Sequence, residues 1–329
     1  MSVKLFGFRS RGALLALVLL MAAACGSDTP IAPGGAVAIT CPSAVDRDSV
    51  DGGPVSVTFD APHAMSSANP VTTTCSMQSG NMFSVGTTTV SCQASDAAGK
   101  TAACSFTVTI HPPPQLQYKK FLAFGDSLTE GTISLAPMIL AVDAPQSYPS
   151  VLRGYLQDRY VVQKPDVINA GLGGETATDG AIRLRSVLLS TRPEVLLLME
   201  GSNDLLSLQA GANRALAALD GMMREAEGQG VRVCLATVPP QRAGGVRHRD
   251  AVAALIPSFN NDVRALAARR GAVLVDVYDG MKDDLSLIGV DDLHPTPHGY
   301  EVMAKIFFNA IRTAFEVKTS ALAPLGLRR

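Results

Sequence analysis

One pattern limits the fold of this chain more than any other: between residues 118 and 316, short apolar runs alternate with helix-like segments. The apolar runs are KKFLAFGDS, PDVINAG, PEVLLLMEG, VRVCLATVPP and AVLVDVYDG, and a helix-like segment follows each of them. Repeats of a strand and a helix indicate a parallel sheet with helices on both faces, and such apolar strands are typical of burial on both faces. The sequence therefore predicts an α/β domain built as a three-layer, doubly wound parallel sheet.

Composition excludes several other classes of protein. The 329 residues are 47% hydrophobic and 17% charged, which predicts folded domains with a sizeable core rather than general disorder. This length suits two domains. The net charge of −1 argues against a nucleic-acid partner. No apolar run reaches the roughly 18 residues that indicate a membrane-spanning helix.

The amino terminus has the layout of an export signal. Three basic residues precede an apolar run over residues 13–24, so we predict a signal peptide over residues 1–24. The run ends in Ala-Ala-Ala-Cys and resembles a bacterial lipoprotein signal, which implies that Cys25 becomes the lipidated first residue. The alternative is a plain secretory signal cut near Cys25. The basic residues are Lys4, Arg9 and Arg11.

The lipoprotein resemblance implies a location as well. Residues 25–36 are small and rich in proline and glycine, as expected of a flexible tether. The resemblance implies an exported protein of the cell envelope, held to a membrane by its lipid. Gly26 rather than an aspartate follows the cysteine, so the resemblance favours the outer membrane or periplasm as the location. Ordinary secretion is the alternative.

Residues 37–111 have a different texture, with short runs of Thr, Val and Ser between turn residues. Asp96-Ala97-Ala98-Gly99 separates two such runs and predicts a hairpin, and short strands of this kind favour a β-sandwich. The stretch FSVGTTTVSCQASDAAGKTAACSFTVTI, together with CPSAV, resembles a hyalin-repeat (HYR) module. The resemblance implies an immunoglobulin-like extracellular domain used for adhesion or spacing. A proline linker is expected at 112–117, and a tail at 317–329.

Four cysteines fall within this predicted sandwich. In an exported chain they are expected to form two disulfides, for which three pairings are possible and remain open. Cys234 lies in an apolar run of the second domain and is expected to be a buried free thiol. The four disulfide candidates are Cys41, Cys75, Cys92 and Cys104.

Polar residues gather where the predicted strands of the α/β domain end. Ligands of such sheets bind outside the carboxyl ends of the strands, so these residues are expected at one edge. They supply a hydroxyl, glycine amides, a carboxamide, and a carboxylate with an imidazole. The segments are GDS (125–127), NAGLGGET (169–176), EGSNDL (200–205) and DDLHPT (291–296).

This inventory suits acyl transfer. Ser127 needs a base to become a nucleophile, and His294 is the candidate base. Asp291 is expected to orient the imidazole, with the adjacent Asp292 as its rival. The N–H groups of Ser127 and Gly174 and the side chain of Asn203 are the candidate oxyanion donors.

The same blocks, in this order, resemble those of the SGNH, or GDSL, hydrolase family over residues 118–316. The four letters of that name fall on Ser127, Gly174, Asn203 and His294, and the aspartate of the D-x-x-H block falls on Asp291. Ser202 stands where threonine is common. The resemblance implies a flavodoxin-like fold and a serine esterase that needs no cofactor. Its substrate would be a small-molecule, lipid or glycan ester or a thioester. The competing class is an adhesion or carbohydrate-binding surface protein with a degenerate hydrolase domain.

Taken singly, each candidate has a simpler interpretation. Ser127 is compatible with an ordinary turn, Asn203 with a helix cap, and the glycines of 171–174 with a flexible loop or a phosphate cradle. No Gly-Lys-Ser/Thr follows these glycines, which excludes a P-loop. His294 and His298 have the spacing of a zinc pair on a helix, but prolines at 295 and 297 disfavour that geometry. The G-x-S-x-G elbow of the α/β-hydrolase fold is absent around the serine.

Two further stretches carry alternatives. Residues 133–142, ISLAPMILAV, are expected either to wall an acyl pocket or to pack onto the domain surface. Residues 241–249 contain Arg242, Arg247 and Arg249, which could attract an anionic substrate or membrane; a solvated basic loop is the favoured interpretation.

Overall fold

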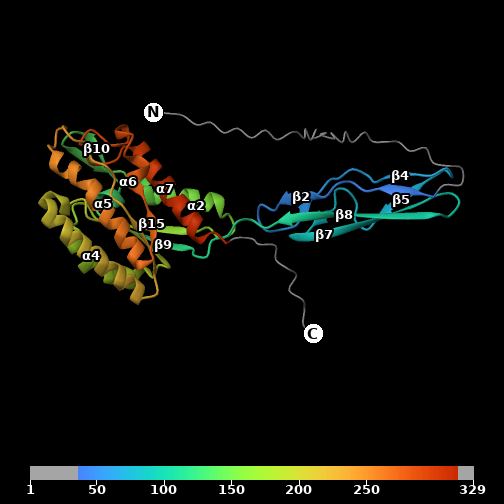
Figure 1. Ribbon diagram of the computed structural model, residues 1–329, viewed down its shortest axis with the longest axis horizontal. Helices are drawn as coiled ribbons and strands as arrows, with labels where there is room; N and C mark the ends of the chain where they lie inside the picture. Colours follow the sequence, from blue (N-terminus) through green and yellow to red (C-terminus); the bar gives the residue numbers. More distant parts are fainter. Residues whose placement is uncertain (1–35, 318–329) are drawn as a thin grey trace, which may run out of the picture. The chain divides into compact units, whose positions relative to one another are not determined.

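The computed structural model describes residues 36–317 (Figure 1). The predicted signal peptide and Cys25 lie outside the described residues. Among the residues that are described, no helix is both long and apolar enough to cross a membrane.

The chain divides into two compact units. Within the described residues, the first comprises 36–42, 60–77 and 90–106, and the second comprises 43–59, 78–89 and 107–317. The strands β7 (Gly86–Ser95) and β8 (Thr101–His111) contribute residues to both units.

The first unit is built from antiparallel pairs and two disulfides. β1 (Ala38–Thr40) pairs with β4 (His63–Met65), and β5 (Thr72–Cys75) pairs with β7 from Thr72 opposite Ser95 to Cys75 opposite Cys92. The disulfides join Cys41 to Cys104 and Cys75 to Cys92, which selects one of the three possible pairings.

The predicted hairpin between β7 and β8 is confirmed. Asp96 N–H donates to Lys100 O at 3.0 Å, and the Asp96 carboxylate accepts from the N–H groups of Ala98 and Lys100. β7 and β8 are 10 and 11 residues long, so two strands exceed the short strands that the sequence suggested.

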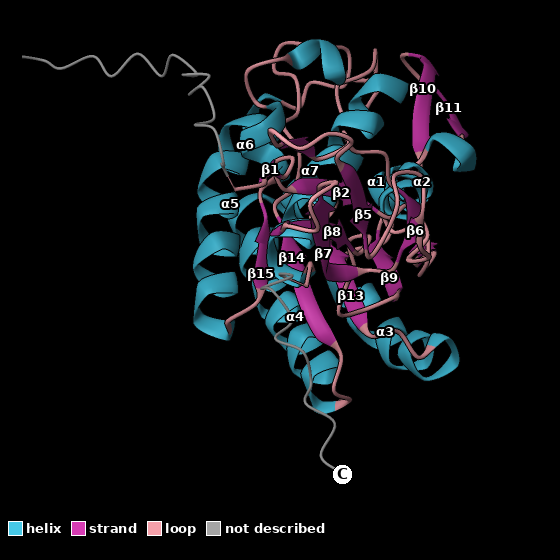
Figure 2. Ribbon diagram, turned by 90° about the vertical axis from the view of Figure 1, so that its right-hand side faces the viewer, coloured by secondary structure: helices cyan, strands magenta, loops and turns pink. Residues whose placement is uncertain are grey.

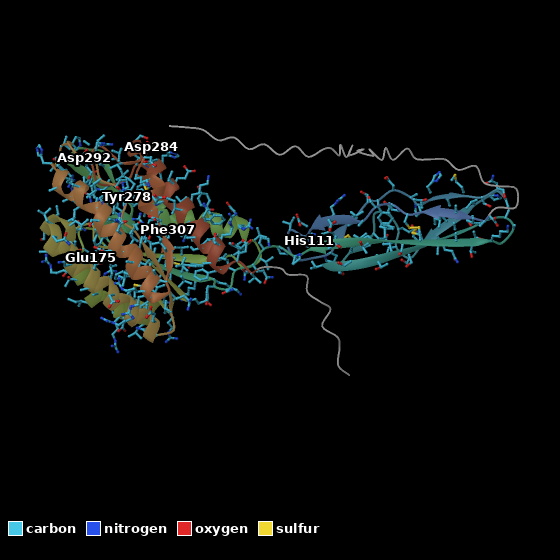
Figure 3. The ribbon with its side chains drawn as sticks, viewed as in Figure 1. His111, Glu175, Tyr278, Asp284, Asp292 and Phe307 are labelled. Atoms are coloured by element: carbon cyan, nitrogen blue, oxygen red, sulfur yellow. A yellow bond between two sulfur atoms is a disulfide. The ribbon has the colours of Figure 1, made fainter. Side chains whose placement is uncertain are left out.

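The second unit begins with the remaining strands of the β-rich region. β2 (Val45–Asp48) pairs in parallel with β8, and β3 (Val55–Ser56) pairs antiparallel with β6 (Met82–Phe83). The largest sheet of the β-rich region has the order β2-β8-β7-β5. His111 ends β8 (Figure 3).

A five-stranded parallel sheet forms the centre of the α/β domain, as predicted. Its order is β12-β9-β13-β14-β15, so the first strand of the domain lies between the second and the third. In the register, Gly125 lies beside Gly171 and Met199, so three strands end level with one another. The strands are β9 (Lys120–Gly125), β12 (Asp166–Gly171), β13 (Val195–Met199), β14 (Arg232–Ala236) and β15 (Val273–Val275).

Helices cover both faces of this sheet, with α2 and α7 on one face and α3, α4 and α5 on the other (Figures 1 and 2). The long helices follow the strands at the predicted positions. They are α2 (Tyr148–Arg159), α3 (Ala177–Thr191), α4 (Leu208–Gly228), α5 (Asp250–Arg270) and α7 (Pro297–Phe315). The short ones are α1 (Ser127–Glu130), α6 (Val277–Met281), η1 (Ala144–Gln146), η2 (Asp204–Ser207) and η3 (Leu285–Leu287).

Strand residues alternate between two cores, because successive side chains of a strand point to opposite faces. Phe121 and Leu197 join the core under α2 and α7, where Phe307 stacks on Tyr148 with ring centres 4.5 Å apart. Leu122 and the other alternate residues join the core under α3, α4 and α5. This two-sided burial explains why the strands read as unbroken apolar runs.

A small hairpin, not predicted as such, follows the first turn of the domain. Residues 132–142 form β10 (Thr132–Ala136) and β11 (Ile139–Val142), which pair antiparallel (Figure 2). Several of its apolar side chains are exposed, with Met138 at 75% and Leu135 at 65%. The expectation that this stretch packs onto the domain surface is therefore wrong for much of it.

The last residues of the predicted linker pack against the α/β domain. Leu116 is 2% exposed, and Gln163 hydrogen-bonds both its N–H and its carbonyl. Gln117 N–H donates to Phe315 O, and Val317 N–H donates to Gln115 O. Residues 115–117 are thus fixed to the end of α7.

Candidate active site

Ser127 stands at the first position of α1, directly after β9. Asp126 caps this helix by accepting from Leu128 N–H at 2.9 Å. A side chain at Gly125 would place its Cβ 2.2 Å from Met199 O, so the tight turn that presents the serine requires glycine there. Ser127 is 7% exposed.

His294 and Asp291 complete a hydrogen-bonded series with this serine. His294 Nε2 lies 2.9 Å from Ser127 Oγ, and Nδ1 lies 2.6 Å from Asp291 Oδ2. Asp291 is fully buried and also accepts from His294 N–H at 3.1 Å. Burial would raise the pKa of Asp291, but the hydrogen bonds and charge of His294 outweigh it and lower the pKa to about 2. The carboxylate is therefore ionised and able to fix the imidazole.

Asp292, the rival for this position, points elsewhere. Its carboxylate accepts from Arg242 Nη1 at 3.1 Å and from Arg247 N–H at 3.2 Å. Its φ of 68° lies in the left-handed region, and its carboxylate and that of Asp291 have different partners. Asp292 is labelled in Figure 3. Adjacent aspartates thus serve two different parts of the site.

The candidate oxyanion donors converge on the same place. Gly174 and Asn203 line one cavity with Ser127 and His294. Asn203 Nδ2 donates to Glu175 O at 2.8 Å and makes only a longer contact, 3.4 Å, with Asp126 Oδ2. Asn203 does stand at the N-cap position of η2, but its side chain makes no capping hydrogen bond there.

Gly174 is constrained by its backbone and not by space. A Cβ there would meet no atom within 4 Å, whereas its φ of +80° is one that other L-residues rarely adopt. Gly171 and Gly173 differ, because a side chain at either position would collide with Glu130. A Cβ at Gly171 would lie 2.1 Å from Glu130 N, and a Cβ at Gly173 would lie 2.7 Å from Glu130 Oε2. The loop is therefore packed onto α1 and is not simply a flexible glycine-rich segment.

Buried carboxyl groups lie behind the serine. Burial raises the pKa of Asp126 to about 7, with further contributions from Asp204 and Glu175. Burial, and then neighbouring carboxylates, raise the pKa of Glu200 well above its ordinary range. Glu175 is paired with Arg183, whose Nε lies 2.7 Å from Glu175 Oε1.

The site opens into a cavity of about 360 Å³. One part of its wall is apolar and comes from Leu140, Ala141 and Val142 of β11, as the pocket-wall interpretation of residues 133–142 expected. Another part is cationic and comes from Arg247 and Arg249.

The favoured interpretation of residues 241–249 as a solvated basic loop is wrong. Arg249 is 8% exposed, and Arg242 donates to the carbonyl oxygens of Gly289 and Ile288 at 3.0 and 2.7 Å. The loop folds inward because buried carbonyl groups and Asp292 supply acceptors that the sequence alone does not reveal.

Sequence reasoning also missed Tyr300. Its hydroxyl donates to Thr132 O at 2.6 Å and approaches Ser127 O at 3.4 Å, so it supports the segment that follows the nucleophile. The available signal was its place at one turn from the start of α7, beside the histidine block.

A metal site is not formed by the histidine pair. His298 is exposed at the start of α7 and contacts Glu301, away from His294. Residues 36–317 contain no group of three His, Cys, Asp or Glu side chains able to hold a metal ion. Cys234 is buried and free, and burial raises the pKa of its thiol to about 12, in keeping with a packing role.

A doubly wound sheet whose edge carries serine, histidine and aspartate in hydrogen-bonded series is typical of a serine hydrolase. The profile of the GDSL-like Lipase/Acylhydrolase family matches residues 123–302, more than half of the chain. The chain therefore belongs to this family of hydrolases, which act on ester bonds. The HYR domain profile matches residues 37–110.

Two curated proteins are similar to this chain. The uncharacterized lipoprotein YqeF of Bacillus subtilis is 27% identical, with 56% of this chain and 86% of the relative covered. Esterase TesA of Pseudomonas aeruginosa is 25% identical, with 55% of this chain and 82% of the relative covered.

Solved structures show the same fold. The lipase/acylhydrolase of Enterococcus faecalis superposes with a TM-score of 0.51 at 22% identity, covering 60% of this chain and 97% of its own. The native aryl esterase of M. smegmatis also superposes with a TM-score of 0.51, at 19% identity, covering 59% of this chain and 99% of its own.

Proposed function

We propose that the protein is an exported serine esterase that hydrolyses carboxylic esters through an acyl-enzyme. The observation that carries this proposal is the series Ser127–His294–Asp291, with separations of 2.9 and 2.6 Å. The relatives named esterase support the reaction class.

In the first half of the reaction, Ser127 Oγ attacks the ester carbonyl carbon while His294 Nε2 takes its proton. The carbonyl oxygen becomes an oxyanion, which the N–H groups of Ser127 and Gly174 and the amide of Asn203 stabilise. The intermediate collapses, the alcohol leaves with the proton from His294, and the acyl group stays on Ser127.

In the second half, His294 takes a proton from water, and the resulting hydroxide attacks the acyl carbon. Collapse returns the proton to Ser127 Oγ and releases the carboxylic acid. Asp291 stays ionised throughout and stabilises the imidazolium. No step needs a cofactor.

Hydrolysis of a small chromogenic ester tests this mechanism. Ser127→Ala and His294→Ala should each remove nearly all turnover, because the two side chains act as a unit. Far-ultraviolet circular dichroism and the melting temperature should stay close to those of the wild type. Wild-type turnover in either folded variant would contradict the mechanism.

The domain organisation is part of the same proposal. We assign residues 37–111 to a spacer module, residues 118–316 to the hydrolase, and residues 112–117 to the linker, whose last three residues pack on the hydrolase. Lipidation at Cys25 would hold the mature protein to the cell envelope, and the similarity to a named lipoprotein supports this. Cys25→Ser should move the protein out of the membrane fraction and abolish labelling by a fatty-acid analogue. A Cys25→Ser variant that stayed in the membrane fraction and still took up the fatty-acid analogue would refute the lipid anchor at Cys25.

A further inference from the structure

The cationic wall of the active-site cavity is not used by the mechanism above. We propose that Arg249 and Arg247 bind an anionic group, a carboxylate or a phosphate, on the ester substrate. This inference rests on the proposed esterase function and names a property of its substrate.

Arg249 carries a buried charge with which no carboxylate of the described residues pairs directly, although three nearby aspartates attract it. The residue is 8% exposed, and its Nη1 donates to Gln241 Oε1 at 3.0 Å. Gln241 is neutral, and its own amide donates to Ser202 Oγ at 3.1 Å. Among residues 36–317, no carboxylate forms an ion pair with Arg249 within 4.0 Å. Burial of an unpaired charge is costly, which points to a partner supplied by the ligand.

Arg247 adds a second, incompletely paired guanidinium in the same cavity. Its Nη2 lies 3.3 Å from Asp291 Oδ2, an oxygen already engaged by His294. Its Nε is buried and finds no acceptor in the described part of the chain. The like charges of Arg247 and Arg249 disfavour one another, and burial together with Arg247 lowers the pKa of Arg249. An anion between them would relieve both effects.

The loop that carries these arginines is held in place before any ligand binds. Asp292 accepts from Arg242 and from the backbone of Arg247, and Gly244 N–H donates to Asp250 Oδ1 at 2.7 Å. A Cβ at Gly245 would lie 2.1 Å from the Asp292 carboxylate, so the loop approaches it closely. Such prior ordering reduces the entropy lost on binding.

The remaining wall defines the other half of the ligand. Leu140 and Val142 of β11 line the same cavity as the arginines and Ser127. An ester with an apolar part and an anionic part satisfies both walls. The anion could belong to the acid side, as a second carboxylate, or to the alcohol side, as a phosphate.

Matched pairs of esters distinguish three possibilities: an anion on the acid side, an anion on the alcohol side, and the absence of an anion site. The first pair is the mono-4-nitrophenyl ester of adipic acid and 4-nitrophenyl hexanoate, which differ by a terminal carboxylate. The second is a monohexanoyl-glycerol phosphate and the corresponding monohexanoyl-glycerol. We expect wild-type kcat/KM to be at least about 10-fold higher for the anionic member of one pair, the usual effect of charge-assisted hydrogen bonds.

Arginine variants then assign the preference. Arg249→Gln and Arg247→Gln should each lower the anionic-to-neutral ratio of kcat/KM by about 10- to 100-fold, mainly through KM. Arg249→Lys should restore part of it. Arg185→Gln is the matched control. The Arg185 side chain on α3 is 74% exposed, and the substitution removes the same charge as the two test variants. Its ratio should equal that of the wild type.

A binding measurement gives an independent readout. In Ser127→Ala, the preferred anionic ester should raise the melting temperature more than its neutral partner, and Arg249→Gln in that background should remove the difference. A wild type that hydrolyses both pairs but prefers the neutral members would overturn the anion site and leave the esterase intact. If Arg249→Gln lowered kcat/KM equally for the anionic and the neutral ester of a pair, Arg249 would have a structural role instead. Failure to hydrolyse any of the four esters would count against the esterase itself.

Discussion

At the scale of single residues, two adjacent aspartates divide the work of the histidine block. Asp291 fixes His294, while Asp292 holds the loop that brings Arg247 to the cavity. The left-handed φ of Asp292 makes the division possible, since it points neighbouring carboxylates in different directions. One short segment therefore connects the reaction centre to the wall that we assign to substrate binding.

Asn203 offers a test of the oxyanion assignment. Asn203→Ala should lower kcat by about 10²- to 10³-fold, because it removes a donor that acts on charge developed in the transition state. KM should change much less. Asn213→Ala, an exposed asparagine on α4, is the control and should keep the wild-type kcat. An unchanged kcat in the first variant would remove Asn203 from the oxyanion site.

Asp126 predicts how stability depends on pH. Its pKa rises from an ordinary 3.8 to about 7 in the folded protein, chiefly through burial. Between these values the folded state binds more protons than the unfolded state, so the free energy of unfolding should fall as the pH rises through that window. Asp126→Asn should flatten this slope in denaturant titrations from pH 4 to pH 8. Parallel slopes for wild type and variant would contradict the assignment.

At the scale of elements, the turns after the strands decide whether the site exists. Gly174 illustrates this, because its requirement is a φ of +80° and not a lack of space. Gly174→Ala should cost about 1–2 kcal/mol of unfolding free energy and lower kcat by displacing the N–H donor. Gly154, exposed within α2 with nothing near its Cβ, is the matched glycine. Gly154→Ala should be neutral or slightly stabilising. Equal melting temperatures and equal kcat for the two variants would refute the argument.

The elements also show what a sequence reveals. The strands, the long helices and the carboxyl-end clusters follow from local apolar runs and turn residues, and these were predicted. The inward fold of residues 241–249 was not, because it depends on partners far along the chain: Arg242 meets Asp292, 50 residues away. Likewise, nothing local to residues 133–142 distinguishes an exposed hairpin from a packed segment.

At the scale of the whole molecule, the residues that we propose as catalytic all lie in the α/β domain. A fragment that begins at Gln115 should fold alone and hydrolyse a small soluble ester with nearly the wild-type kcat/KM. A fragment that begins at Tyr118 should melt at a lower temperature, because it lacks Leu116, which is 2% exposed and bonded to Gln163. A well-folded Gln115 fragment with kcat/KM reduced about a hundredfold would place part of the substrate site in the β-rich region.

A single titration shows whether Ser127 is the only nucleophile of this protein. The intact protein is treated with rising amounts of a fluorophosphonate, and hydrolysis of a chromogenic ester is measured beside peptide mass spectrometry. We expect one probe per molecule, located on Ser127, with activity falling in proportion to labelling; Ser127→Ala should take up no probe. Full labelling of Ser127 with hydrolysis undiminished would contradict this expectation.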